Sequence, residues 1–410
     1  MKKVIVISFT FPPIEGIGGR RWAKFSKYFL RDGIDVRVVT AKLPLTGDSE
    51  WTADIKELKA AGRIHYFSTS YPWALISPPK NVIQKIKYRV ALFRVKQKIK
   101  GNFYDKSALC EKPLLDTLIP LIEQGYKNII ISVGPFYYAS FLTDLKTRYP
   151  GLNLILDVRD PWTNNKTSFG YSTLERNRFA VEKLAEAKVA ANYDHIVSVA
   201  DDMGEYFKNE YGVPENKIVT IKNGFDLEDI PASTMETNEA RTVVFTGNLY
   251  EKAHGSFLMF YNQLQELKDK NPELLDRYRF HFYGEIHPSM KYYFRSELNL
   301  YFHNKIALKE VYSKISNASA CLLFLTDDLN YSFSTKFYEY LSLKKPILVF
   351  SKPGKTGEFV EQHHIGRQMD HLNLEETLLT LESGKYYDMP VDISGYDVRN
   401  LAKTYLTLIH

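Results

Sequence analysis

The sequence predicts an α/β protein built from two doubly wound domains, each with a mostly parallel sheet. The first half alternates apolar, strand-like runs at residues 128–132, 152–160 and 195–200 with helical segments. After a polar stretch that contains Pro231, the same alternation begins again at Arg241. Strands that alternate with helices favour a parallel sheet, and the restart indicates a second domain. The 410 residues suffice for two domains of about 200 residues each.

The domain bounds follow from this restart. We place an N-terminal Rossmann-like domain at residues 1–228 and a C-terminal Rossmann-like domain at residues 240–395. The last segment, 396–410, has a helical pattern and is expected to pack back on the first domain. Open α/β sheets bind ligands beyond the carboxyl ends of their strands. We therefore expect the loops at 12–21 and 247–255 to face one another across a deep cleft.

The composition is that of an ordinary globular protein, with 44% hydrophobic residues and a net charge of +6. The first apolar run stops at Pro12 and Pro13 without a cleavage site, and no segment approaches about 20 uninterrupted apolar residues. The two cysteines, Cys110 and Cys321, lie far apart and lack metal-ligand spacing. These features predict a cytoplasmic protein without a structural zinc site.

A glycine-rich loop joins the first predicted strand to the first helix. The loop "FTFPPIEGIGGRR" at residues 9–21 follows an unbroken apolar run at 4–8. Glycines allow the backbone to approach an anionic ligand, and the free N–H groups at the start of the helix favour a phosphate. The loop therefore predicts a phosphorylated ligand. A tight turn at Gly18 and Gly19 without a ligand is the alternative.

The same loop argues against a dinucleotide site. The fingerprint requires G-x-G-x-x-G, but counting from Gly16 places Arg21 where the third glycine belongs. The second strand ends in Thr40 rather than in an acidic residue. A nicotinamide-dependent oxidoreductase is therefore the weaker alternative.

A basic segment at residues 80–102 carries eight Lys or Arg and no acidic residue. Its apolar residues Ile83, Ile86, Val90 and Phe93 fall on one helical face. A basic amphipathic helix predicts contact with an anionic membrane surface. The alternative is a solvated basic face on a helix whose apolar side packs on the domain. No nucleic-acid-binding motif accompanies the segment, so nucleic acid is not expected as a partner.

The most specific chemistry lies in "NYSFSTKFYEYLSLKKPILVF" at residues 330–350. Ser332, Ser334 or Thr335 can cap a helix that carries Lys336 in its first turn. Helix-terminal N–H groups, hydroxyls and a lysine together form a pyrophosphate cradle. Glu339, one turn further, can accept hydrogen bonds from ribose hydroxyls. An exposed Lys336–Glu339 ion pair is the alternative.

This stretch resembles the donor-site helix of retaining glycosyltransferases of family 4, which have the two-domain GT-B fold. The segments "FPPIEGIGGRR", "LDVRDPW", "VTIKNGFD", "VVFTGNL", "FHFYGE" and "KTGEFVEQHHIG" match family landmarks in the expected order over nearly the whole chain. The resemblance implies transfer of a sugar from a nucleoside-diphosphate sugar to a hydroxyl of a glycan or lipid-linked acceptor, with retention of configuration. It implies no cofactor and no metal.

The resemblance also assigns the site residues. The implied donor-binding residues are Gly18, Gly19, Gly247, Asn248, Lys252, Ser334, Thr335, Lys336 and Glu339. The implied catalytic residues are Asp160, Lys336 and Glu339, and the implied acceptor-side residues are Arg20, Arg159 and Trp162. Asp160 would orient a sugar, or cap the turn after its strand. Trp162 would stack on a sugar ring, or fill the core, and Arg20 with Arg21 would contact phosphate, or be charges on a helix surface.

Four positions depart from the family pattern. Tyr331 stands where members often have a glutamate, Asn248 where they have an arginine, and Arg159 where many have a histidine. The usual lysine of the second-domain loop corresponds to Lys252 or His254. The leading hypothesis is a transferase of surface polysaccharide biosynthesis at the inner membrane face. The departures favour, as its rival, a catalytically silent protein of the same fold that binds sugar nucleotides or glycans.

Overall fold

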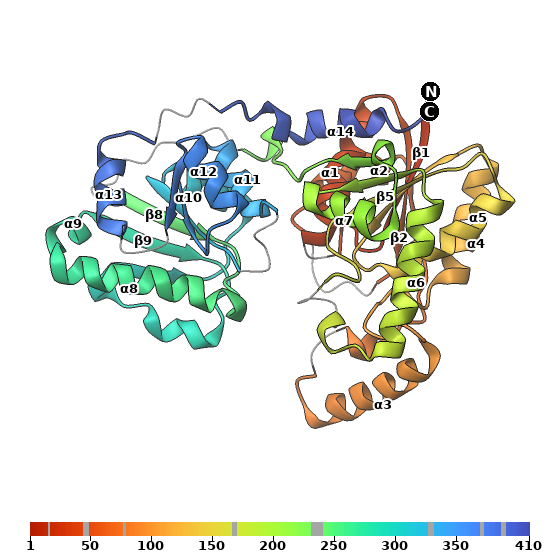
Figure 1. Ribbon diagram of the computed structural model, residues 1–410, viewed down its shortest axis with the longest axis horizontal. Coiled ribbons are helices and arrows are strands. Elements are labelled where there is room, and N and C mark those ends of the chain that lie inside the picture. Colours follow the sequence, from red (N-terminus) through yellow and green to blue (C-terminus); the bar gives the residue numbers. More distant parts are fainter. Residues whose placement is uncertain are drawn as a thin grey trace. The chain divides into compact units, whose positions relative to one another are not determined.

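The computed structural model describes residues 1–14, 17–43, 49–76, 79–165, 170–230, 241–326, 332–369, 373–386 and 391–410. The chain separates into two compact units, Met1–Lys222 with Ala402–His410 and Asn223–Leu401 (Figure 1). Each unit is a parallel sheet covered by helices, which confirms the predicted α/β class with two Rossmann-like domains.

The described residues of the first unit form a seven-stranded parallel sheet in the order β3-β2-β1-β4-β5-β6-β7. The strands are β1 Lys3–Ser8, β2 Asp35–Ala41, β3 Ile64–Phe67, β4 Asn128–Val133, β5 Asn153–Val158, β6 His195–Ser198 and β7 Ile218–Thr220. The helices are α1 Arg20–Arg31, α2 Lys56–Ala60, α3 Val82–Lys98, α4 Glu111–Glu123, α5 Thr143–Arg148, α6 Arg176–Asn192 and α7 Asp201–Tyr211. Strands β4 and β5 are buried throughout, since helices cover both faces of the sheet.

The second unit repeats this plan with six parallel strands in its described part, in the order β10-β9-β8-β11-β12-β13. The strands are β8 Arg241–Thr246, β9 Tyr278–Tyr283, β10 Leu300–His303, β11 Ala320–Phe324, β12 Ile347–Phe350 and β13 Gly366–Met369. The helices are α8 His254–Lys270, α9 Pro272–Asp276, α10 Leu308–Ser316, α11 Thr335–Ser342, α12 Lys355–Gln362 and α13 Leu374–Glu382. The last helix, α14 Val398–Leu406, begins in this unit and ends in the first.

Both sheets have a switch point, where the strand order reverses. In the first unit it lies between β1 and β4, and in the second between β8 and β11. The loops that follow these strands leave the sheet in opposite directions at its carboxyl edge. Ligands of open α/β sheets bind at this place. The fold therefore selects the loops after β1, β4, β8 and β11 as candidate binding elements.

The boundaries between the two units in the sequence differ from the predicted domain bounds. The divisions fall between residues 222 and 223 and between 401 and 402. The Phe225 N–H donates to the Tyr396 carbonyl at 3.0 Å, and the Val398 N–H donates to the Phe225 carbonyl at 2.9 Å. This short parallel pairing makes residues 223–228 part of the second unit.

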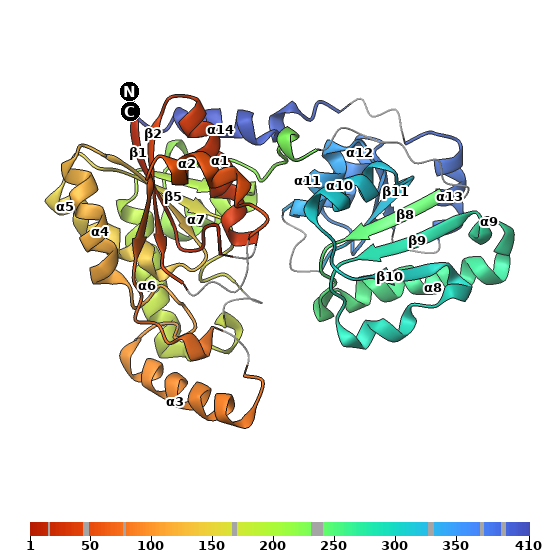
Figure 2. The ribbon, with the colours of Figure 1, turned by 180° about the vertical axis from the view of Figure 1, so that it is seen from behind.

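The last residues of the chain close the first unit. The Lys2 ammonium donates to the carbonyls of Leu406 and Ile409 at 2.8 and 2.6 Å. The side-chain amide of Asn153 donates to the Leu408 carbonyl at 2.7 Å, and that of Asn128 donates to the His410 carbonyl at 2.8 Å. The two chain termini consequently lie side by side (Figure 2).

A buried ion pair fixes the start of α1. Arg21 Nε lies 3.2 Å from Asp157 Oδ1, and both side chains are almost fully buried. Asp157 also accepts hydrogen bonds from Trp22 Nε1 at 2.7 Å, from Ser132 Oγ at 2.9 Å and from the Tyr405 hydroxyl. Four donors therefore surround one carboxylate, and they come from α1, β4 and α14.

The rest of the Arg21 guanidinium binds the chain where it leaves the first unit. It donates to the Ile221 and Lys222 carbonyls at 2.7 and 2.9 Å. Burial alone would raise the pKa of Asp157, but the Arg21 charge and the donated hydrogen bonds outweigh it and lower the pKa. The expectation that Arg21 is a surface charge or a phosphate ligand is therefore wrong, because its donors already hold backbone and carboxylate oxygens.

Helix α3 packs on the first unit through Leu92, Val95 and Ile99. These are not the residues of the predicted apolar stripe, which is exposed to solvent. The alternative in which that stripe packs on the domain is therefore wrong. Across the described ranges, no helix has both the length and the hydrophobicity needed to cross a bilayer.

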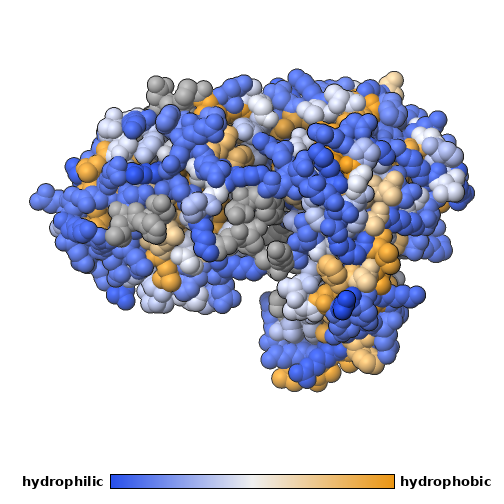
Figure 3. Space-filling view, viewed as in Figure 1, coloured by the Kyte–Doolittle hydropathy of each residue, from blue (hydrophilic) through white to orange (hydrophobic). Residues whose placement is uncertain are grey.

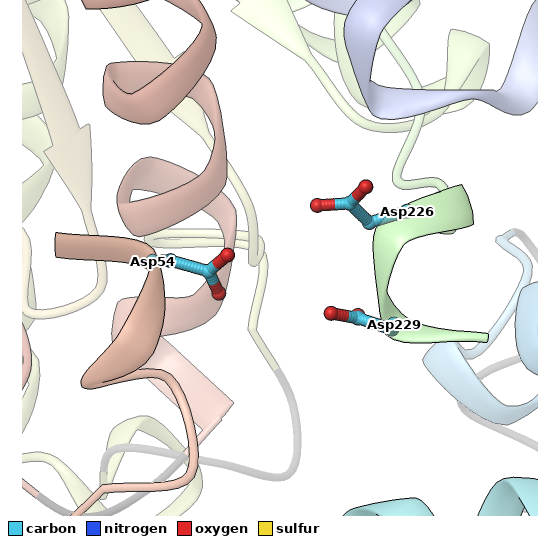
Figure 4. Close-up of side chains that lie close together, drawn as sticks. All are labelled: Asp54, Asp226 and Asp229. Carbon is cyan, nitrogen blue, oxygen red and sulfur yellow. The ribbon is translucent and has the colours of Figure 1, made fainter. Parts of the chain in front are cut away.

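Three acidic side chains shown in Figure 4 have local structural settings. Asp226 caps the short 3₁₀ helix Leu227–Asp229 by accepting from the Glu228 N–H at 3.0 Å, and Asp229 ends the same turn. Asp54 accepts from the ammonium groups of Lys24 and Lys27 within the first unit, at 3.1 and 2.8 Å. The carboxylates of Asp226 and Asp54 therefore each have a partner within their own unit.

We expect Asp157→Asn to lower the free energy of unfolding by about 3–5 kcal/mol, because it leaves the buried Arg21 without its counter-charge. Urea unfolding followed by far-UV circular dichroism measures the change. The control is Asp116→Asn, which removes the exposed Lys112–Asp116 pair and should have little effect. Equal losses in the two variants would contradict a dominant role for the buried pair.

Candidate functional site

The turn after β8 in the second unit is built from two glycines in close approach. Gly247 has φ +98°, and Gly284, which follows β9, has φ +142°. A Cβ on Gly284 would lie 2.2 Å from the Gly247 carbonyl oxygen. The Gly247 N–H donates to the Tyr283 carbonyl at 2.8 Å. Only glycine fits this crossing, so the turn after β8 is held in one conformation.

Helix α11 begins at the same edge of the sheet. The Ser334 hydroxyl caps it by accepting from the Phe337 N–H at 3.3 Å. Phe337 and Leu341 are buried in the core, as their spacing predicts. The Thr246 N–H donates to the Tyr340 hydroxyl at 3.1 Å, which ties α11 to the end of β8. The first turn of α11, with Thr335 and Lys336, is thereby fixed at the switch point.

Lys336 extends from this first turn over the glycine turn. A Cβ on Gly247 would lie 2.5 Å from Lys336 Cε, and Lys336 Nζ lies 5.5 Å from the centre of the Phe245 ring. Burial lowers the pKa of Lys336, and the nearby Glu339 carboxylate opposes this shift. Both side chains are half-buried, so they are not an exposed surface pair.

Three groups therefore lie near the switch point of the second sheet. They are the Lys336 side chain, the N-terminal N–H groups of α11 and the capping hydroxyl of Ser334. Helix N-termini carry a partial positive charge, which favours phosphate groups. Glu339 lies one turn along α11 from Lys336, and its charge opposes the lowering of that lysine's pKa by burial.

The other residues of the predicted donor site are more dispersed. The Asn248 side chain is half-buried and donates to the Tyr250 hydroxyl at 3.3 Å. Lys252 is exposed on the short 3₁₀ helix Glu251–Ala253. Tyr331 lies outside the described residues. The structure thus brings Gly247, Ser334, Thr335, Lys336 and Glu339 together and leaves Lys252 at the surface.

A cavity of about 160 Å³ opens at the ends of β11 and β12, on the same edge. Ser351, Gly354, Thr356 and Gly357 are among the residues that line it. The Thr356 side chain is buried, and its hydroxyl has no hydrogen-bond partner in the described part of the chain. The sequence did not indicate this cavity, because its lining comes from two loops that are remote in sequence.

The corresponding edge of the first unit is organised by Arg159, which follows β5. Its guanidinium donates to the Gly18 carbonyl at 2.5 Å and to the Gly134 carbonyl at 3.0 Å. It therefore connects the loop after β1 with the loop after β4 across the switch point. A Cβ on Gly19 would lie 3.0 Å from Pro12 Cδ, so the close approach favours glycine there.

Asp160 lies half-buried beside Arg159. Burial raises the pKa of Asp160, and the Arg159 charge opposes this rise. Arg159 itself is committed to backbone carbonyls, so its role is to position the loops. Asp160 is thus a half-buried carboxyl group directly after β5.

Two predicted acceptor-side residues belong to the core. Trp162 is 1% exposed and stacks on Phe136, with ring centres 5.7 Å apart and an interplanar angle of 16°. Its indole face is covered, so the expectation that Trp162 stacks on a sugar is wrong. Arg20 is also buried, and its guanidinium lies over the Trp51 ring at 5.0 Å. It is not a charge on a helix surface.

Trp162 is part of a buried acidic cluster that the sequence did not reveal. Trp162 Nε1 and the Tyr171 hydroxyl each donate to Glu182 Oε2 at 2.9 Å, and the Asn102 N–H donates to Glu182 Oε1 at 2.7 Å. Burial, followed by the charge of Asp105, raises the pKa of Glu182 to about 7. Glu182 therefore titrates close to neutral pH inside the first unit.

Comparisons with known proteins concern the fold and part of the first unit. Residues 128–229 match the family model of Glycosyltransferase Family 4. A glycosyltransferase from Rickettsia africae has a similar structure at 11% identity, with a TM-score of 0.59, 99% of this chain covered and 97% of that chain. A mutant S. aureus TarM in complex with Fondaparinux, alpha-GlcNAc-glycerol and UDP is similar at 12% identity, with a TM-score of 0.54, 100% of this chain covered and 99% of that chain.

The UDP-GlcNAc 2-epimerase of Methanocaldococcus jannaschii is similar at 12% identity, with a TM-score of 0.52, 100% of this chain covered and 99% of that chain. No curated protein matches the sequence. The structural likenesses establish the GT-B fold. The family match is confined to residues 128–229 of the first unit, about a quarter of the chain.

We expect Gly247→Ala to lower the free energy of unfolding by about 1–2 kcal/mol, because alanine is strained at a positive φ. The new methyl group must also displace the Lys336 side chain. Gly255→Ala is the matched control, since a Cβ there meets nothing within 4 Å. Thermal and urea unfolding measure both variants, and equal stability of the two would contradict the close approach at Gly247.

The pH dependence of stability should depend on Glu182. Its folded-state pKa of about 7 lies above the reference value of 4.5, so the folded state binds this proton more tightly. Its contribution is present in full below pH 4.5 and is lost as the pH rises to about 7. Relative to Glu182→Gln, the wild type should lose up to about 3 kcal/mol of unfolding free energy over this window. Parallel stability–pH curves for the two proteins would contradict this assignment.

Proposed function

We propose that the protein is a retaining glycosyltransferase that moves a sugar from a nucleoside-diphosphate sugar to a hydroxyl of a glycan or lipid-linked acceptor in surface polysaccharide biosynthesis. The observation that carries the proposal is the position of Lys336, which lies over Gly247 in the first turn of α11. This arrangement places a cation and a helix N-terminus at the switch point of the second sheet. It suits a diphosphate in both charge and place.

The proposed donor is held by three parts of the second unit. The diphosphate accepts hydrogen bonds from the first N–H groups of α11 and from Lys336. Gly247, which has no side chain, lets the backbone approach the diphosphate, and Glu339 accepts hydrogen bonds from the ribose hydroxyls. The similar TarM structure contains UDP and the similar epimerase is named for UDP-GlcNAc, which supports uridine diphosphate as the first donor class to test.

The proposed reaction breaks the bond between the anomeric carbon and the diphosphate oxygen. The acceptor oxygen bonds to the anomeric carbon on the same face of the ring, and its proton passes to the departing phosphate oxygen. Negative charge grows on the diphosphate during this step. Lys336 and the α11 N-terminus are fixed in advance where this charge grows, and such preorganised groups stabilise a transition state. In this proposal they perform the role that a divalent metal has in other transferases.

The first unit supplies the acceptor side in this proposal. The loop of Gly18 and Gly19 contacts the donor, and Asp160 orients a sugar hydroxyl. Arg159 supports both elements, because it holds the Gly18 carbonyl and lies beside Asp160. Its effect on transfer is therefore indirect and acts through the loop geometry.

A silent sugar-nucleotide or glycan-binding protein is the second candidate function. The observation that favours it is Asn248, which stands in the turn after β8 where the family pattern has an arginine and bonds to Tyr250. Such a protein would bind a nucleoside diphosphate through the same site. It would not release the diphosphate from a sugar nucleotide, whichever acceptor is supplied.

The first test is ligand-dependent thermal stabilisation by UDP, GDP, ADP, CMP and NAD, each with and without magnesium. A ligand at about 100 times its Kd adds about 2.7 kcal/mol to the folded state. We expect one nucleoside diphosphate to stabilise the protein equally with and without magnesium. Stabilisation by NAD alone would instead support the oxidoreductase, and no stabilisation by any ligand would contradict the donor site.

A pair of lysine variants tests whether Lys336 itself contributes to nucleotide binding. Lys336 and Lys309 are the second residues of α11 and α10, and Lys309 is exposed. We expect Lys336→Ala to weaken the affinity for the stabilising nucleotide about 10- to 100-fold, as for the loss of a charged hydrogen bond. Lys309→Ala should leave the affinity unchanged, and Glu339→Ala should weaken it for the nucleotide more than for inorganic pyrophosphate.

A further inference from the structure

Helix α3 is attached to the first unit by one face only. Asn81 caps its start by accepting from the Gln84 N–H at 2.9 Å. Leu92 packs beside Val95 and Ile99, which belong to a small core cluster with Tyr71 and Phe103. The contacts are concentrated in the second half of the helix, so its first half projects from the body of the unit (Figure 1).

The opposite face of α3 carries an apolar stripe that the fold leaves uncovered. Its members are Val82, Ile83, Ile86, Val90 and Phe93, which are between 46% and 71% exposed. At about 100° per residue, these five side chains fall within an arc of about 100°. The packed residues lie on the other side of the helix. Figure 3 shows hydrophobic and hydrophilic atoms side by side over this part of the surface.

Cations border the apolar stripe on both sides. By the same helical spacing, Lys85, Arg89 and Lys96 line one border, and Lys87, Arg94 and Lys98 line the other. The helix has no acidic residue. Lys96 lies over the Phe103 ring at 4.6 Å, and the other five form no ion pair within the part of the chain that the structure describes. Their charge therefore remains available to a partner.

The combination of an apolar stripe and flanking cations distinguishes between the partners that could bind this face of α3. A nucleic acid would be bound by the cations but would gain little from a stripe of Ile, Val and Phe between them. An anionic bilayer is complementary to both features, because the apolar side chains enter the boundary of the acyl chains while long cationic side chains reach the headgroup phosphates. The symmetric borders allow the helix to lie flat in that interface.

We propose that α3 docks the first unit on an anionic lipid surface, with the stripe of Val82, Ile83, Ile86, Val90 and Phe93 inserted and the six flanking cations at the headgroups. The inference rests on the structure of α3 and not on the proposed sugar transfer. Lipid binding and nucleotide binding can therefore succeed or fail separately. If both hold, the lipid-linked class of acceptors is favoured, since the enzyme is then held where such acceptors lie.

The test is co-sedimentation of the full chain with vesicles of phosphatidylcholine alone or mixed with phosphatidylglycerol. We expect binding to the anionic vesicles, at least 10-fold weaker binding to neutral ones, and a steep decrease with added salt. Ile86→Ser combined with Phe93→Ser removes apolar contact without changing the charge. Lys85→Gln, Arg89→Gln and Arg94→Gln together remove charge without changing the stripe. Each set should reduce the fraction bound at least 10-fold.

The matched control is the triple variant Lys56→Gln, Lys59→Gln and Lys112→Gln, which removes the same charge from exposed sites away from α3. It should bind the anionic vesicles like the wild type. Because Cys110 and Cys321 are buried, a cysteine introduced at Ile86 can be labelled selectively with an environment-sensitive dye. We expect its emission to shift to the blue on anionic vesicles, while a dye at Gln84, on the other side of the helix, should not respond.

Three results would overturn the proposal. The first is an absence of vesicle binding at any lipid composition. The second is equal binding by the wild type and the serine variant, which would leave only a diffuse charge effect. The third is self-association or nucleic-acid binding that is abolished by the serine variant while vesicles remain unbound, which would assign the stripe to another partner.

Discussion

The first unit depends on one buried charge, the Arg21 guanidinium. A buried cation is tolerated only when it is paired and its donors are satisfied, and here Asp157 and two backbone carbonyls meet that requirement. Because Arg21 is the second residue of α1, it fixes the end of the glycine loop. Because its other partners are the Ile221 and Lys222 carbonyls, it also fixes the point where the chain leaves the unit. Tyr405 adds the last helix to the same network.

The same part of the first unit restricts the backbone at Gly18 and Gly19. Gly19 has no room for a side chain against Pro12, and the Gly18 carbonyl is held by Arg159. Gly18 and the start of α1 are therefore held by two arginines, Arg159 and Arg21. A ligand that contacts these residues would meet a preformed backbone, which keeps the entropy cost of binding low.

Much of the fold could be predicted from the sequence because parallel strands buried on both faces are unbroken apolar runs, as in β4 and β5. The bounds of the units were less accessible, since they depend on the pairing of Phe225 with the segment at 396–398, which is remote in sequence. The GT-B class was correctly predicted from ordered motifs, whose glycines and caps act locally. Neighbouring residues set the conformation of such glycines and caps, so it depends little on the rest of the fold.

The same distinction between local and tertiary contacts applies to the residues of the candidate site. Ser334, Lys336 and Gly247 could be anticipated, because a helix cap and a positive-φ turn are set by neighbouring residues. The burial of Arg20 and Trp162 could not, because Trp51 and Phe136 cover them from other parts of the chain. A tryptophan after a strand has the same sequence context whether it meets a ligand or the core. Tertiary contacts alone decide between the two.

Helix α3 also has a feature that the sequence could not predict, namely which of its apolar faces is buried. Its spacing indicated an apolar face, but the helix has two, one centred on Val95 and one on Ile86, on opposite sides. Opposed apolar faces cancel in any measure of amphipathicity, and periodicity alone cannot say which face is covered. The small core cluster of Tyr71 and Phe103 makes that choice, because it accepts the second half of the helix. The face that stays exposed to solvent is the one bordered by cations, because the opposite face of α3 packs on the first unit.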